Sequence, residues 1–125
     1  MKPGIDVLLI EDEPSIAEAI RFILSREGWR CSQWSEGAEA VQQILGLRPR
    51  LVILDVMLPG RNGLQVLADL RATPPIAATP VLVLTAQGGP IQAPGASMVL
   101  AKPFANEDLR QAVRGLLALA PPPPP

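Results

Sequence analysis

Short and nearly continuous apolar runs recur along this chain, separated by segments in which the apolar residues are spaced differently. Three runs are strong, at residues 5–10, 51–54 and 81–84, and two are weaker, at 29–34 and 97–101. A continuous apolar run of this length is typical of a strand that is buried on both faces, as in a parallel sheet. The pattern therefore predicts five strands, of which the 29–34 strand is polar enough to lie at an edge of the sheet.

The segments between the runs carry apolar residues three or four positions apart, which predicts amphipathic helices. A first helix begins at Pro14, because proline favours the first helical position, and stops at Gly28. Further helices are predicted over 36–47, around 64–70 and around 109–117. Strands that alternate with helices favour the α/β class, with a parallel sheet covered by helices on both faces.

The composition fits one small domain. The chain has 125 residues, too few for two ordinary domains, and 48% of them are apolar, which is enough to form a core. We expect a single domain over residues 1–120, followed by a proline-rich tail or linker at 121–125 in the polyproline II conformation.

The charge balance and the absence of one residue type exclude several classes of function. A net charge of −1 offers no basic surface for nucleic acid, and no apolar stretch is long enough to cross a bilayer. Without a histidine, the chain can neither build a Ser-His-Asp triad nor donate a phosphoryl group from histidine. Cys31 is the single cysteine, so no internal disulfide can form, and we expect a cytoplasmic protein.

Polar residues that can carry chemistry stand where the predicted strands end. Glu11 and Asp12 follow the first strand, Asp55 the third, Thr85 the fourth and Lys102 the fifth. In a parallel sheet of this class ligands bind at the carboxyl ends of the strands. We therefore expect these groups to converge on one pocket.

The residue types in this pocket favour phosphoryl chemistry on a carboxylate. Carboxylates that are packed closely repel one another, and an oxygen-only ligand set without histidine or cysteine favours Mg²⁺ as the ion that relieves the repulsion. Asp55 is the natural nucleophile, because a carboxylate can form an aspartyl phosphate. Lys102 supplies a positive charge for phosphoryl oxygens, and Thr85 supplies a hydroxyl donor.

Four motifs, in this order, resemble those of the receiver domains of bacterial two-component response regulators. They are residues 10–14 (IEDEP), 55–63 (DVMLPGRNG), 84–86 (LTA) and 102–104 (KPF). The resemblance spans essentially residues 5–119. It implies a flavodoxin-like, doubly wound sheet of five parallel strands in the order 2-1-3-4-5.

The resemblance also implies a role for each site residue. Asp55 would be the phosphoacceptor, and Thr85 and Lys102 would contact the phosphoryl oxygens. A cis peptide bond would join Lys102 to Pro103. The groups that would hold Mg²⁺ are Asp12, Asp55, the backbone carbonyl of Met57 and, through water, Glu11.

The function implied by the resemblance is that of a phosphorylated switch. A sensor histidine kinase or a phosphotransfer protein would donate a phosphoryl group to Asp55, and the domain would then change how it binds an output partner or effector domain. The sequence does not name that output. The only catalysis implied is Mg²⁺-dependent self-phosphotransfer and autodephosphorylation.

Two positions depart from the family's usual pattern. Val99 stands in the fifth strand where the family usually has tyrosine or phenylalanine, and valine has no ring to move with the threonine hydroxyl. Residues 87–96 (QGGPIQAPGA) are short and rich in glycine and proline, which oppose a helix. We therefore expect the family's fourth helix to be missing or shortened, and the domain to signal through another surface or through ordering of this segment.

Three other functions fit fewer of these residues. A phosphorylation-independent adaptor of receiver fold is favoured by Val99 and the 87–96 segment, but it leaves the complete set of site residues unexplained. A phosphatase of the haloacid dehalogenase type also uses an aspartate at a strand end, but it needs a second acid two residues later, where this chain has Met57. A nucleotide-binding fold is opposed by the lack of a glycine-rich phosphate-binding motif.

Overall fold

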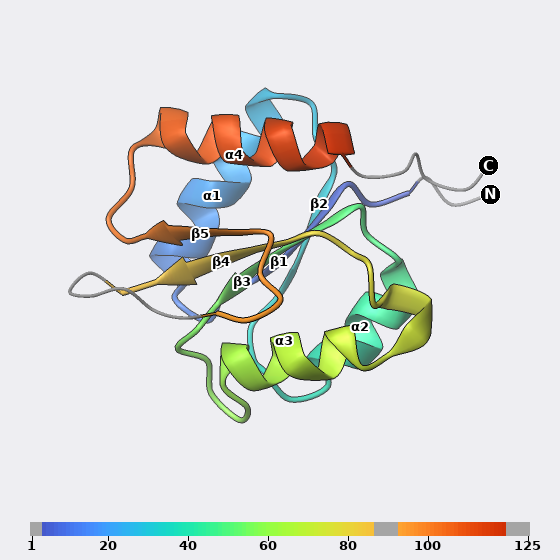
Figure 1. Ribbon diagram of the computed structural model, residues 1–125. Helices are drawn as coiled ribbons and strands as arrows, with labels where there is room; N and C mark the ends of the chain where they lie inside the picture. Colours follow the sequence, from blue (N-terminus) through green and yellow to red (C-terminus); the bar gives the residue numbers. More distant parts are fainter. Residues whose placement is uncertain (1–3, 87–92, 120–125) are drawn as a thin grey trace.

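A central sheet organises the computed structural model, which describes residues 4–86 and 93–119 (Figure 1). The five strands are all parallel and lie in the order β2-β1-β3-β4-β5. The strands are β1 (Val7–Ile10), β2 (Cys31–Trp34), β3 (Leu51–Asp55), β4 (Val81–Thr85) and β5 (Met98–Ala101). The predicted class and strand order are confirmed, and β2 is an edge strand, as its polar composition predicted.

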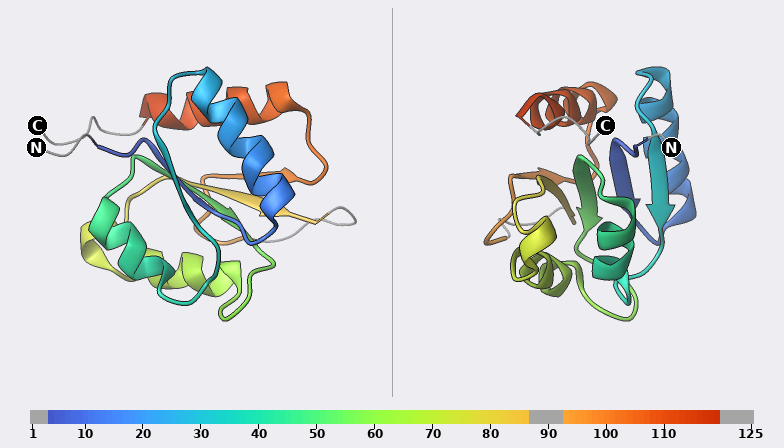
Figure 2. Two further views of the ribbon diagram at one scale, coloured as in Figure 1. Left: turned by 180° about the vertical axis from the view of Figure 1, so that it is seen from behind. Right: turned by 90° about the vertical axis from the view of Figure 1, so that its right-hand side faces the viewer.

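Helices cover both faces of the sheet. One face carries α1 (Pro14–Arg26) and α4 (Asn106–Leu119), and the other carries α2 (Ala40–Leu47) and α3 (Gly63–Arg71) (Figures 1 and 2). A short 3-10 helix, η1 (Pro74–Ile76), follows α3. Within the described ranges, none of the helices combines the length and the apolar character that a membrane crossing needs.

The hydrophobic core has two halves, one on each face of the sheet. Because successive strand residues point to opposite faces, Val7 and Leu9 of β1 pack with α1 and α4, whereas Leu8 and Ile10 pack with α2 and α3. The central strands β1, β3 and β4 are buried along their whole length. This explains the continuous apolar runs in the sequence, since a strand covered on both faces has no position that favours a polar residue.

One helix begins later than its sequence pattern predicts. The helix predicted over 36–47 begins at Ala40. The amide of Gly37 donates to the carbonyl of Pro59 at 2.9 Å, and Glu39 adopts the left-handed backbone conformation with φ of 61°. These contacts hold residues 35–39 as a loop, which we call the β2–α2 loop.

Two predictions fall wholly or partly on residues outside the described ranges. In the segment 87–96, where we predict a missing or shortened helix, residues 93–96 form a turn and residues 87–92 lie outside the description. The described part of the chain contains four α-helices. The proline-rich tail predicted at 121–125 also lies outside the described residues.

An arginine fastens the turn before β5 to α3. The guanidinium of Arg71 donates to the carbonyl of Gly95 at 2.7 and 2.9 Å. It also donates to the carbonyls of Ala77 and Thr79, at 2.9 and 2.6 Å. Three backbone carbonyls, which come from two separate connections, are thereby held to the end of α3.

The second edge strand, β5, is less covered than the rest of the sheet. The side chains of Met98 and Val99 are 43% and 41% exposed. Val99 pairs in register with the buried Val83 of β4. The residue that departs from the family's pattern therefore lies at the surface, in a strand that offers it little packing.

Candidate functional site

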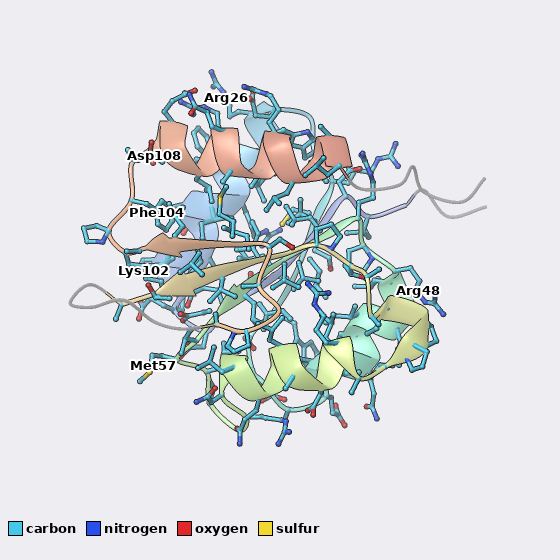
Figure 3. The ribbon with its side chains drawn as sticks, viewed as in Figure 1. Arg26, Arg48, Met57, Lys102, Phe104 and Asp108 are labelled. Atoms are coloured by element: carbon cyan, nitrogen blue, oxygen red, sulfur yellow. The ribbon has the colours of Figure 1, made fainter. Side chains whose placement is uncertain are left out.

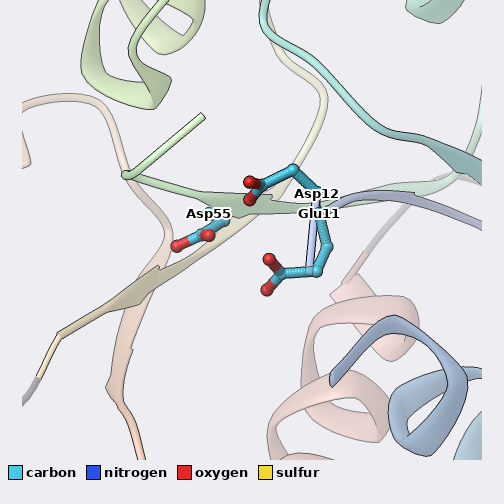
Figure 4. Close-up of side chains that lie close together, drawn as sticks. All are labelled: Glu11, Asp12 and Asp55. Carbon is cyan, nitrogen blue, oxygen red and sulfur yellow. The ribbon is translucent and has the colours of Figure 1, made fainter. Parts of the chain in front are cut away.

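Three carboxyl groups meet at the carboxyl ends of β1 and β3. The register of these neighbouring strands pairs Ile10 with Leu54, so the residues that follow, Glu11 and Asp55, come next to each other. One carboxylate oxygen from each of Glu11, Asp12 and Asp55 lies within 4.8 Å of the others. Figure 4 shows the three side chains drawn together at this end of the sheet. The convergence predicted from the strand ends is therefore observed for these acids.

Glu11 is the most deeply placed of the three acids. It is 0% exposed and Asp55 is 3% exposed, whereas Asp12 lies at the surface. Oε2 of Glu11 accepts a hydrogen bond from the amide of Glu13 at 3.1 Å. Burial raises the pKa of Glu11 to about 7, although the hydrogen bonds from Lys102 and from the Glu13 amide act in the opposite direction.

Lys102, which directly follows β5, provides the positive charge of the site (Figure 3). Its Nζ lies 3.0 Å from Glu11 Oε1 and 3.2 Å from Asp55 Oδ2. Burial alone lowers the pKa of this ammonium group, but the hydrogen bond to Glu11 and the charge of Asp55 outweigh burial and raise the pKa. The peptide bond between Lys102 and Pro103 is cis, as predicted. Lys102 therefore stays charged and is shared by two buried acids.

Thr85 and Met57 flank the acidic cluster. Thr85 is the last residue of β4, is buried, and accepts a hydrogen bond from the Lys102 amide at its carbonyl, at 2.8 Å. Asp55 pairs in register with Leu84, the residue before Thr85, so the two strand ends adjoin. The side chain of Met57 is 71% exposed, while its backbone amide donates to Asp55 Oδ1 at 3.4 Å (Figure 3). Met57 therefore approaches Asp55 through its backbone.

A glycine allows the β3–α3 loop, residues 56–62, to return to the strand that it leaves. The amide of Gly63 donates to the carbonyl of Val56 at 2.8 Å. A Cβ atom at Gly63 would lie 2.1 Å from the carbonyl oxygen of Asp55, so no side chain fits there. Adjacent asparagine and glycine in a sequence indicate a turn but not what lies against it, so this contact could not be predicted.

An apolar cavity of about 550 Å³ opens beside Lys102, between α1 and the chain that follows β5. Its lining includes Ile16, Ala19, Ile23, Pro103 and Phe104. Phe104 is half-buried and packs against the core half formed with α1 and α4. The sequence pattern did not indicate this cavity, because its walls come from a helix and a loop that are far apart in the chain.

Residues 7–114 match the family described as response regulator receiver domain. The chain belongs to this family. The receiver domain is 35% identical over 116 residues to the DNA-binding response regulator MtrA of Mycolicibacterium smegmatis, and this alignment covers 89% of the chain and 50% of MtrA. The receiver domain thus spans about half the length of the curated relatives that it matches.

Solved structures share the fold of this receiver domain. A putative response regulator from Chloroflexus aurantiacus has a TM-score of 0.85 and 34% identity, covering 93% of this chain and 99% of that one. The receiver domain of the sensor histidine kinase PA1611 from Pseudomonas aeruginosa has a TM-score of 0.83 and 29% identity, with coverage of 93% and 99%. That structure has a magnesium ion coordinated in its active site cleft.

The acidic cluster of this receiver domain fits the same kind of ion. Its three close carboxylates offer oxygen ligands only, which is the donor set that a hard divalent cation prefers. One of the three, Asp12, is exposed, so the cluster can be reached from solvent.

Proposed function

We propose that this receiver domain takes a phosphoryl group onto Asp55 in a Mg²⁺-dependent reaction and thereby changes what it binds. The observation that carries the proposal is the position of the Asp55 carboxylate, which is almost fully buried and lies 3.2 Å from Lys102 Nζ. A buried carboxylate with a fixed cation beside it is positioned for the transfer of a negatively charged group. Membership of the receiver family supports the same role.

Four groups of this chain would hold the ion, in the roles that the family resemblance implies. Asp12, Asp55 and the backbone carbonyl of Met57 would bind Mg²⁺ directly, and Glu11 would act through water. When bound, the ion neutralises negative charge on the carboxylates and on the phosphoryl oxygens. The backbone amide of Met57 already donates to Asp55, which keeps this stretch of chain close to the cluster.

In the proposed transfer, one oxygen of the Asp55 carboxylate attacks the phosphorus atom of the donor. The bond between phosphorus and the leaving group breaks, and the leaving group keeps the electron pair and takes a proton from solvent. The product is a mixed anhydride, an aspartyl phosphate. In hydrolysis a water oxygen attacks the same phosphorus, the bond to the Asp55 oxygen breaks, and inorganic phosphate leaves. Lys102 and Thr85 would contact the phosphoryl oxygens in both steps.

Replacing Lys102 with methionine should slow phosphoryl uptake by about tenfold to a hundredfold, because the charge that develops on the phosphoryl oxygens loses a fixed cation. The measurement is the rate of mass gain with acetyl phosphate and Mg²⁺. Arg110→Met is the matched control, since Arg110 pairs with Glu107 on the surface of α4. Equal rates for the two variants would contradict a role of Lys102 in the transfer.

We infer that the phosphoryl donor is a sensor histidine kinase or a phosphotransfer protein, and that the transfer takes place in the cytoplasm. The chain has no histidine of its own, so the donor is a separate molecule or domain. The apolar cavity beside Lys102 suits the approach of a partner, because its lining reaches from Ile16 of α1 to Ala86, the residue that follows β4. A partner helix placed there would come close to Asp55.

Ala19→Glu should slow transfer from such a protein donor by about tenfold or more, because it puts a charge into an apolar contact surface. Uptake from acetyl phosphate should stay unchanged, since a small donor does not need that surface. Both rates are measured with a phosphotransfer protein that phosphorylates the unchanged chain. Ala68→Glu, on an exposed position of α3, is the control. Equal slowing by the two variants would place the docking surface elsewhere.

The test of the proposed function is the intact mass of the protein after incubation with Mg²⁺ and acetyl phosphate. A gain of one phosphoryl group that depends on Mg²⁺ supports the switch. No gain in folded protein would favour the second candidate, a phosphorylation-independent adaptor of receiver fold. The observation that favours this second candidate is Val99, which is exposed on β5 and has no ring to move.

A further inference from the structure

Two loops at the site end of the sheet are joined directly. The β2–α2 loop lies against the β3–α3 loop, residues 56–62, which leads away from the phosphoacceptor. The amide of Gly37 donates to the carbonyl of Pro59 at 2.9 Å. The segment that precedes α2 is therefore in contact with the segment that follows Asp55.

The two loops fit too closely for a side chain at the contact. A Cβ atom at Gly37 would lie 1.6 Å from the carbonyl oxygen of Arg61. Gly60 has a φ of +82°, and a Cβ atom there would lie 3.2 Å from Cβ of Ala38. Because the Gly37 contact is with the backbone of Arg61 and the Gly60 contact is with the Cβ of Ala38, a displacement of one loop requires the other to yield.

Of the two joined loops and the helix that follows them, the start of α2 is the part that can change its position. Glu39 holds a left-handed backbone conformation, with φ of 61°, that is costly for a residue with a side chain. Among the described residues, no side chain caps the first turn of this eight-residue helix. The first turn is tied instead through the Ala40 amide, which donates to the Gly37 carbonyl at 3.2 Å. Its position therefore depends on where Gly37 lies.

Trp34 connects the β2–α2 loop to the acidic cluster as well. Its backbone carbonyl accepts from the amide of Glu11 at 3.0 Å. Its indole Nε1 donates to the carbonyl of Ala38 at 2.9 Å. The β2–α2 loop is thus coupled to both sides of the site, to the acid that follows β1 and to the loop that follows Asp55.

We propose that the β2–α2 loop positions the β3–α3 loop, which follows the phosphoacceptor Asp55, and carries the phosphorylation signal to the first turn of α2. This inference rests on the proposed function. A phosphoryl group on Asp55 adds negative charge and oxygen acceptors beside the Met57 amide, which rearranges the β3–α3 loop. The displacement reaches Gly37 through the joined loops and shifts the strained turn at Glu39. The route needs no aromatic ring in β5, where this chain has Val99.

The coupling works in both directions, because the free energy that links two sites is shared between them. If phosphorylation of Asp55 moves the start of α2, a change that disturbs Gly37 must alter the equilibrium extent of Asp55 phosphorylation. The surface that changes for an output partner is then the start of α2.

The first test compares amide hydrogen exchange of the unchanged protein with and without excess acetyl phosphate, with Mg²⁺ in both samples and the intact mass of each recorded. When the phosphoryl group is present, exchange at residues 35–41 should change by about twofold or more in rate. A phosphoryl gain with unchanged exchange at 35–41 overturns the coupling and leaves the proposed function intact. No phosphoryl gain overturns the proposed function and the coupling with it.

The second test compares a glycine at the loop contact, Gly37, with a glycine inside α2, Gly46, whose added Cβ meets no other atom. Gly37→Ala should slow phosphoryl uptake by about tenfold or more, because it displaces the β3–α3 loop. Gly46→Ala, inside α2 with nothing within 4 Å of its added Cβ, should leave the rate within about twofold. A folded Gly37→Ala protein that takes up phosphate at the Gly46→Ala rate overturns the proposal. If Gly37→Ala does not fold, the exchange measurement decides.

Discussion

Replacing Asp55 with asparagine should abolish phosphoryl uptake from acetyl phosphate, so that intact mass shows no gain. The side chain keeps its size, but a neutral amide is a poor nucleophile and cannot form the acyl phosphate. The fold should persist, because the amide oxygen can still accept the hydrogen bond from Met57 that Oδ1 accepts now. The loss would therefore be a loss of chemistry, and circular dichroism checks that the variant is folded.

Asp108→Asn is the matched control for this variant. Asp108 is exposed on the first turn of α4, outside the acidic cluster. Its replacement should leave phosphoryl uptake unchanged. If Asp55→Asn still gained a phosphoryl group, and peptide masses placed it on Glu11 or Asp12, the acceptor would be a different acid of the cluster.

Gly63→Ala should lower the free energy of unfolding by about 3 kcal/mol, the upper range for inserting an atom into a packed region. The added Cβ would lie 2.1 Å from the backbone oxygen of Asp55 and 2.8 Å from Cα of Val56. Neither group is the end of a flexible side chain, so the strand and the helix must separate. Urea unfolding measures the change as a shift in the midpoint concentration of urea, with the slope of the free energy against urea concentration unchanged.

Gly46→Ala separates this contact from the general effect of replacing glycine in a helix. Its added Cβ meets nothing within 4 Å, so the change should raise the free energy of unfolding by about 0.5–1 kcal/mol through helix propensity. The expected result is that Gly63→Ala lowers the free energy of unfolding and Gly46→Ala raises it. A neutral Gly63→Ala would mean that the backbone at Asp55 can shift at little cost.

The central strands could be predicted because each central strand of a sheet covered on both faces is a continuous run of apolar residues. The run at 51–54 is apolar at every position, and each of these residues is buried. The start of α2 could not be predicted in the same way. Glu36, Ala38 and Glu39 are compatible with a helix, and it is the contact from Gly37 to the β3–α3 loop that overrides this local preference.

The site could be predicted as a set of strand ends but not as a set of contacts. Family resemblance supplied the strand order, and that order brings Glu11 next to Asp55. Which acids Lys102 would contact depends on side-chain packing, which no periodicity records. The structure places its ammonium group between Glu11 and Asp55, and it leaves Asp12 at the surface.

The tether made by Arg71 uses backbone carbonyls alone. Ala77 and Thr79 offer a backbone carbonyl whatever side chain they carry, so both residues can be substituted without weakening the hydrogen bonds from Arg71. Lysine cannot replace Arg71 in this tether, because a single ammonium group lacks the planar guanidinium geometry that contacts three carbonyls at once. Tolerance to substitution should therefore be high at Ala77 and Thr79 and low at Arg71.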